Sequence, residues 1–320
     1  MRRALLVVTL AVAAIPSSNA ARLGRSPIAL VTSETQNRLL AVDTHRGRLI
    51  KSLPMPADPE NVEAYAGQAA VVSTRAGAVT FLDPRTLQIQ RVVRGFGAPH
   101  IAAFAPGGDY LFVTDDARGQ LAVILGGRVH KIFVGYGAHH MAFSPDQQRL
   151  LIALGEHARS IAVVDTSNPL RPRLEGNFRA HGLAHDLAFT PNGRFVWVTY
   201  ADRPYLRIFA TRSLRPVATL YAGPPPAHVR FDDADGLTPF ATHAYVTSGN
   251  ASALRIFDWR RRRLVRLVRT GAGSYNLAID RGLVATSSLT TGTITLVRDG
   301  RRLLSTRVAP GTRDVALLVP

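Results

Sequence analysis

Five of the ten histidines of this chain stand where a short apolar strand begins, and the strand belongs to a repeat. They are His100, His139, His140, His185 and His228. Neutral imidazole binds zinc, copper and other first-row transition metals, and imidazole also exchanges protons near neutral pH. If the fold gathers these strand openings in one place, the pattern predicts a site for a transition metal or for an organic ligand.

The strand openings supply two rows of residues, which are the first and second positions of the recurring phrase. The first row is Asn61, His100, His139, His185, Ala227, Tyr275 and Arg313. The second row is Val62, Ile101, His140, Asp186, His228, Asn276 and Asp314. Successive residues of a strand point to opposite faces. We therefore expect one of the two rows to face a shared space and His139 or His140 to be turned away.

From these rows we predict one ligand-binding site. Its residues are Asn61, His100, His139, His140, His185, Asp186, His228, Asn276 and Asp314. If the cofactor is a transition metal, its predicted ligands are His100, His139, His185 and His228. Carboxylates on nearby loops, such as Asp116, complete a donor set typical of zinc or copper. Two other interpretations stay open: the histidines fix contacts between repeats, or they bind an organic ligand without metal.

The repeat itself predicts the fold. The last residues of successive phrases, from Tyr65 to Leu317, are 39, 39, 46, 42, 48 and 38 residues apart. A period near forty is typical of a propeller built from four-stranded blades. Turn signals such as Pro191-Asn-Gly follow the opening strands, and short β-branched strands follow the turns. We therefore predict an all-β protein whose first strands surround a central channel.

The two ends of the chain indicate how the ring closes. The first unit lacks its opening strand and begins at Ile28, whereas the chain ends after an unmatched opening strand at Arg313–Val319. The C-terminal strand should therefore pair with the N-terminal blade, which removes the exposed edges of an open array. The prediction is one seven-bladed β-propeller domain over residues 21–320, with the strand openings at one mouth of the channel.

Several phrases resemble the YVTN-type β-propeller repeats, which are related to the lactonase-like propellers. The resemblance rests on Tyr245-Val-Thr-Ser, Phe143-Ser-Pro-Asp and Pro191-Asn-Gly-Arg, and it covers about residues 28–320. Propellers of this type include enzymes, cofactor scaffolds and binding proteins, so the resemblance implies a fold and leaves the function open. For a lactonase-like enzyme the matching chemistry would come from Asn61, Asp186, Asn276 and Asp314. A haem-like cofactor is a third option.

The N-terminal segment predicts export. Residues 1–20 combine a basic start at Arg2 and Arg3, an apolar stretch over 4–15 and a small-residue cleavage site at Ser18-Asn19-Ala20. This apolar stretch is too short to span a bilayer. The chain has no cysteine, so no disulfide can form. We expect a soluble monomer in the periplasm or outside the cell.

The charge of the chain is strongly basic. Removing Arg2 and Arg3 with the signal lowers the net charge from +17 to +15. The densest run, residues 259–269, is predicted to be a charged outer edge strand. Export and the lack of a recognition motif argue against a nucleic-acid partner. We therefore predict a secreted binding or scaffold protein whose partner is a small molecule or an envelope protein. The alternative is a lactonase-like or metal-dependent enzyme acting at the same mouth.

Overall fold

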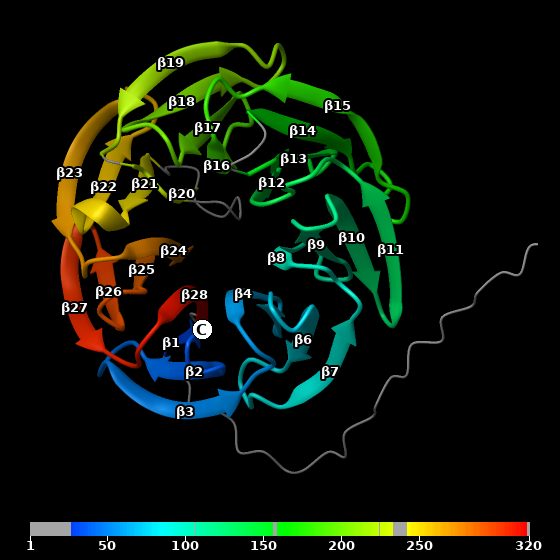
Figure 1. Cartoon of the computed structure of the whole chain (residues 1–320). Helices are drawn as coiled ribbons and strands as arrows, with labels where there is room; N and C mark the ends of the chain where they lie inside the picture. Colours follow the sequence, from blue (N-terminus) through cyan, green and yellow to red (C-terminus); the bar gives the residue numbers. More distant parts are fainter. Residues whose placement is uncertain (1–26, 106, 156–158, 224, 233–241, 319–320) are drawn as a thin grey trace, which may run out of the picture.

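The structure is a computed structural model that describes residues 27–105, 107–155, 159–223, 225–232 and 242–318. Seven antiparallel sheets of four strands each stand around a common axis (Figure 1). The described helical structure is a single 3-10 turn, η1 (Gly249–Ala251). The prediction of an all-β seven-bladed propeller is confirmed. The predicted signal segment, residues 1–20, lies outside the described residues.

The first four blades each run from an innermost strand at the axis to an outermost edge strand. Blade 1 consists of β28 (Thr312–Leu318), β1 (Ile28–Ser33), β2 (Arg38–Asp43) and β3 (Arg48–Pro54). Blade 2 consists of β4 (Pro59–Tyr65), β5 (Gln68–Ser73), β6 (Ala78–Leu82) and β7 (Ile89–Arg94). Blade 3 consists of β8 (Pro99–Phe104), β9 (Leu111–Asp115), β10 (Gln120–Leu125) and β11 (Arg128–Phe133). Blade 4 consists of β12 (Met141–Phe143), β13 (Arg149–Ala153), β14 (Ser160–Asp165) and β15 (Arg173–Arg179).

The last three blades follow the same plan. Blade 5 consists of β16 (Ala184–Phe189), β17 (Phe195–Tyr200), β18 (Tyr205–Ala210) and β19 (Pro216–Tyr221). Blade 6 consists of β20 (Val229–Phe231), β21 (His243–Ser248), β22 (Ala253–Asp258) and β23 (Arg263–Arg269). Blade 7 consists of β24 (Ser274–Asp280), β25 (Leu283–Ser288), β26 (Thr293–Arg298) and β27 (Arg301–Arg307).

The ring closes within blade 1, as the unmatched ends of the sequence predict. β28 pairs antiparallel with β1, and Val315 lies opposite Val31. The last strand of the chain thus becomes the innermost strand of the first blade, beside β1 in Figure 1. The pairing removes two exposed sheet edges at once, because each strand would otherwise present unpaired backbone groups to solvent.

The core lies between neighbouring blades. The middle strands are buried on both faces, as in β9 and β13, because each face packs against a neighbouring blade. Phe112 of blade 3, for example, is fully buried with Ile152 and Val164 of blade 4. The fourth strands are mostly exposed and carry many arginines, as expected for edge strands. No described helix is long and apolar enough to cross a membrane.

Candidate functional site

A β-bulge opens most of the innermost strands, and this bulge determines which side chains reach the axis. In blade 5, Ala184 pairs with Tyr200 and Leu187 pairs with Val198, so His185 and Asp186 together face Thr199. β8 has the same irregularity around His100. The Thr199 hydroxyl accepts the N–H of Asp186 at 3.0 Å, so the extra residue is hydrogen-bonded. A bulge re-aims side chains, so strict alternation does not hold at these positions.

The pairing corrects one of the predicted rows. Pro59 pairs with Ser73 in the way that Pro99 pairs with Asp115 and Thr312 pairs with Ser33. The residue after each of these is the first-row residue, so Glu60 is equivalent to His100 and Arg313. Asn61 therefore belongs to the second row, beside His140, Asp186, His228 and Asp314, and its assignment to the first row is wrong by one position.

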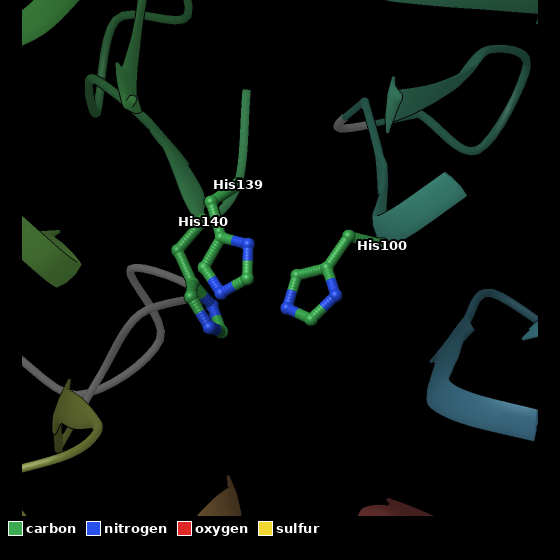
Figure 2. Close-up of side chains that lie close together, drawn as sticks. All are labelled: His100, His139 and His140. Carbon is green, nitrogen blue, oxygen red and sulfur yellow. The ribbon is translucent and has the colours of Figure 1, made fainter. Parts of the chain in front are cut away.

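All five predicted histidines form one cluster, which we call the histidine cluster: His100, His139, His140, His185 and His228. The rings of His100 and His139 stack with centroids 3.6 Å apart. The ring centroid of His140 lies 4.8 Å from those of His139 and His185 and 4.5 Å from that of His228. Figure 2 shows one ring nitrogen of His100 pointing toward the pair formed by His139 and His140.

The expectation that His139 or His140 is turned away is wrong. Both residues precede β12, which begins only at Met141, so neither is held in the alternating geometry of a strand. His228 likewise precedes β20. First-row and second-row histidines therefore share the same space. His140 occupies its middle.

Two overlapping triads of histidines could each hold a metal ion. They are His100, His139 and His140, and His140, His185 and His228. In each triad one ring nitrogen of every residue lies within 4.8 Å of one ring nitrogen of the others. Two zinc–nitrogen bonds span at most about 4.2 Å, so small side-chain rotations would bring a triad onto one ion. The structure thus adds His140 to the predicted metal ligands.

Carboxylates stand behind four of the five rings. Nδ1 of His100 lies 3.0 Å from Glu60, and Nδ1 of His139 lies 3.1 Å from Asp116. Nδ1 of His140 and Nδ1 of His228 each face Asp186 at 3.6 Å, which is longer than a hydrogen bond. A carboxylate that accepts a hydrogen bond from Nδ1–H leaves the lone pair of Nε2 for a metal. The donor set and its outer carboxylates therefore fit a transition-metal ion.

Burial keeps most of these imidazoles neutral. Burial, reinforced by repulsion from His139, lowers the pKa of His100 to about 4 and that of His185 to about 3. Burial together with neighbouring histidines also lowers the pKa values of His140 and His228 well below the usual range. Burial works against ionisation of Glu60, but its bond with His100 holds the pKa of this carboxyl below its ordinary value. Lone pairs on neutral rings are available to a cation at neutral pH.

Three predicted site residues hold neighbouring blades together. We call Asn61, Asp186 and Asp314 the blade clamps, because each side chain accepts an N–H from the innermost strand of the next blade. Asn61 accepts from Ala102 at 2.9 Å, Asp186 from Val229 at 2.9 Å and Asp314 from Val62 at 3.0 Å. The Asn61 amide also donates to Asp314 at 2.7 Å. Asp186 further accepts from the Arg230 guanidinium at 2.8 Å.

One predicted residue remains to be placed, and one site residue was not predicted. Asn276 is buried in β24, at the same second-row position as the blade clamps. The sequence also offers Glu156 and His157 as donors on a loop between the second and third strands of a blade, and both lie outside the described residues. Glu60 is the site residue that the sequence prediction missed. Its signal was its place directly after Pro59, which matches the Pro99-His100 pair in the next repeat.

The fold has many counterparts among solved structures. A functionally unknown protein from Desulfotomaculum acetoxidans superimposes with a TM-score of 0.77 at 14% identity, covering 92% of this chain and 99% of that one. A putative 6-phosphogluconolactonase from Bacteroides uniformis gives a TM-score of 0.73 at 15% identity, covering 92% and 100%. Apo AztD from Citrobacter koseri gives 0.70 at 9% identity, covering 92% and 98%.

These similarities show the fold alone, because every identity is low. No known protein-family profile matches the sequence, and no curated protein matches it either. The chain is therefore similar to propellers that include a lactonase-like one, and its site has to be interpreted from its own residues.

Proposed function

We propose that this protein is a metal-binding propeller that holds one divalent transition-metal ion, zinc or copper, on the histidine cluster. One observation carries the proposal: the five imidazoles form two overlapping triads, and the Nδ1 atoms of His100 and His139 lie 3.0 Å and 3.1 Å from a carboxylate. Carboxylates in this position orient the imidazole and raise its basicity as a ligand.

The shared residue His140 supports a stoichiometry of one ion. His140 is common to both triads, and its Nδ1 atom faces Asp186 at 3.6 Å. The two triads are therefore alternative ligand sets for the same ion. His100 and His139 supply one side of the site, and His185 and His228 supply the other.

A lactonase-like enzyme is less well supported. Its matching residues would include Asp186 and Asp314, whose Oδ2 atoms already accept backbone hydrogen bonds from the next blade. A catalytic carboxylate needs an oxygen directed at the substrate or its metal. The similarity to a putative 6-phosphogluconolactonase, at 15% identity, adds only the fold.

The cellular location, the oligomeric state and the family of the protein are inferred from the sequence alone. Export through the segment 1–20, a monomeric state and membership of the YVTN-type repeats remain proposals. The position of the site at the mouth of the channel is also a proposal. It is supported by His100 and His185, which are each the second residue of an innermost strand, β8 and β16. An exported protein with an all-imidazole site and no cysteine would bind, carry or store a metal without redox chemistry at sulfur.

The experiment is a metal titration of the purified protein after chelator treatment. Isothermal calorimetry with zinc and with copper, checked by elemental analysis, should show one ion per chain and a rise in Tm on loading. The exposed His130 on β11 gives the matched control, because His130→Ala removes an imidazole outside the cluster. If neither ion binds above the level of exposed histidines and neither changes Tm, the proposal is wrong. Turnover on a lactone panel would favour the enzymatic alternative.

A further inference from the structure

Three neighbouring outer strands carry no acidic residue. β23, β27 and β3 are the edge strands of blades 6, 7 and 1, which follow one another around the ring (Figure 1). We call these three strands the basic rim. Its basic residues are Arg263, Arg266, Arg269, Arg301, Arg302, Arg307, Arg48 and Lys51. The sequence of β23 predicted a charged edge strand, and the fold places two more such strands beside it.

Large apolar side chains are exposed between these charges. Six of the ten exposed large apolar residues on described edge strands lie on the basic rim, which holds three of the seven edge strands. They are Leu264, Val265, Leu267, Leu303, Leu49 and Ile50, and each is 44–58% exposed. A surface that alternates arginine with exposed aliphatic residues is amphipathic, which plain protection of an edge does not require.

The seam between blades 6 and 7 contains a shallow, open depression, which we call the cleft. The cleft has a volume of about 490 Å³ and is lined by Arg266, Leu267, Val268, Arg269, Gly300 and Arg302. Arg266 donates to the Gly300 carbonyl at 3.3 Å, which holds one guanidinium at the cleft. None of these three arginines forms an ion pair with a carboxylate in the described part of the chain. Their charge is therefore free to meet an anion.

We propose that the basic rim docks on an anionic phospholipid surface, with a headgroup phosphate in the cleft between β23 and β27. Arginine binds phosphate through paired N–H donors, and aliphatic side chains enter the boundary between headgroups and acyl chains. Nucleic acid fits less well, because the exposed large apolar residues of the rim are aliphatic and offer no stacking surface. A sulfated polysaccharide would use the charges but not the six aliphatic side chains.

The test is vesicle co-sedimentation of the whole protein, with phosphatidylglycerol-containing vesicles and with pure phosphatidylcholine vesicles. Binding is expected on the anionic vesicles and should weaken as salt is added. The triple variant Arg266→Gln, Arg269→Gln, Arg302→Gln should bind them about 100-fold more weakly, since each arginine near such a surface contributes about 1 kcal/mol. These arginines are exposed, so the variant should unfold at the wild-type Tm.

The matched control removes the same charge from other exposed positions, as Arg128→Gln, Arg179→Gln, Arg212→Gln. It should keep most of the binding. Equal loss in both triple variants, or equal binding to both kinds of vesicle, would overturn the proposal. So would binding to dextran sulfate, lost in the rim variant, without binding to vesicles. The variant Leu267→Ser, Leu303→Ser should lose the part of the binding that resists salt.

Discussion

The second-row position of the innermost strands does two different jobs in two parts of the ring. In blades 1 and 2, Asp314 and Asn61 reach sideways and accept an N–H from the next blade. In blades 4 and 6, His140 and His228 occupy the equivalent position and join the histidine cluster. The backbone positions are the same, so the side chain decides whether this position closes the ring or builds a ligand site.

Asp186 in blade 5 belongs to both parts. One of its oxygens accepts hydrogen bonds from Val229 and Arg230, and its carboxylate faces the Nδ1 atoms of His140 and His228. The carboxylate is fully buried. It therefore couples the closure of the ring to the orientation of the metal ligands, and its removal tests both jobs at once.

The largest effect is expected from Asp186→Ala. It removes the ion-pair partner of the partly exposed Arg230 guanidinium and the acceptor of the Val229 N–H, which together should cost about 3 kcal/mol of unfolding free energy. Metal affinity should also fall about 10–100-fold, because two histidines lose the carboxylate that orients them. Urea denaturation and a metal titration measure the two losses. A variant that loses stability but binds metal normally would show that Asp186 is a blade clamp and nothing more.

His140→Ala should affect the histidine cluster without affecting the blade clamps. The substitution removes the ligand common to both triads, so metal affinity should fall by about 100-fold or more, beyond the loss of an outer carboxylate. The apo protein should lose less stability than it does in Asp186→Ala, because the buried ring carries no blade clamp and its removal leaves only a cavity. Calorimetry with zinc and denaturation in chelator are the measurements. An unchanged affinity, with His130→Ala as the reference, would exclude a metal from the cluster.

Asp314→Ala is the converse experiment. It leaves the Val62 N–H and the Asn61 amide without their acceptor, which should cost about 2 kcal/mol of stability. Metal affinity should stay near the wild-type value. Asp314→Asn keeps an acceptor oxygen and should recover part of the loss, whereas Asp109→Ala, at an exposed turn, should cost nothing measurable. Weaker metal binding in Asp314→Ala would mean that the two parts are not separate.

The sequence predicts the ring and the gathering of the histidines because both follow from the repeat. The unmatched strands at Ile28 and Arg313 allow one closure, and equivalent residues of a ring must meet near its axis. The bulges are not predictable in this way, because they depend on which residues face hydroxyls such as that of Thr199. The sequence pattern places the recurring phrase at residues 61–65 in this blade, one position too late. The strand pairing makes residues 60–64 equivalent to the other phrases, so the sequence pattern misses Glu60.

The smallest expected effect is on the pH dependence of the unfolding free energy. It concerns a residue of the histidine cluster, His185, and not the blade clamps of blades 1 and 2. His185 is neutral in the folded protein, where burial lowers its pKa to about 3, whereas the unfolded chain takes up a proton near pH 6.5. The stability linked to this residue is therefore complete above about pH 6.5 and is lost as the pH falls toward 3.

Between about pH 7.5 and 5.5, one such histidine should cost the folded apo protein about 1 kcal/mol. Glutamine does not titrate, so His185→Gln should reduce the pH dependence of the unfolding free energy by that amount. Denaturation at the two pH values, in the presence of chelator, measures it, and His130→Gln should change nothing. The same slope in wild type and His185→Gln would mean that this imidazole titrates near pH 6.5 in the fold, as it does in the unfolded chain. The ring would then not be buried among the other imidazoles, so the metal proposal would lose His185 as a ligand.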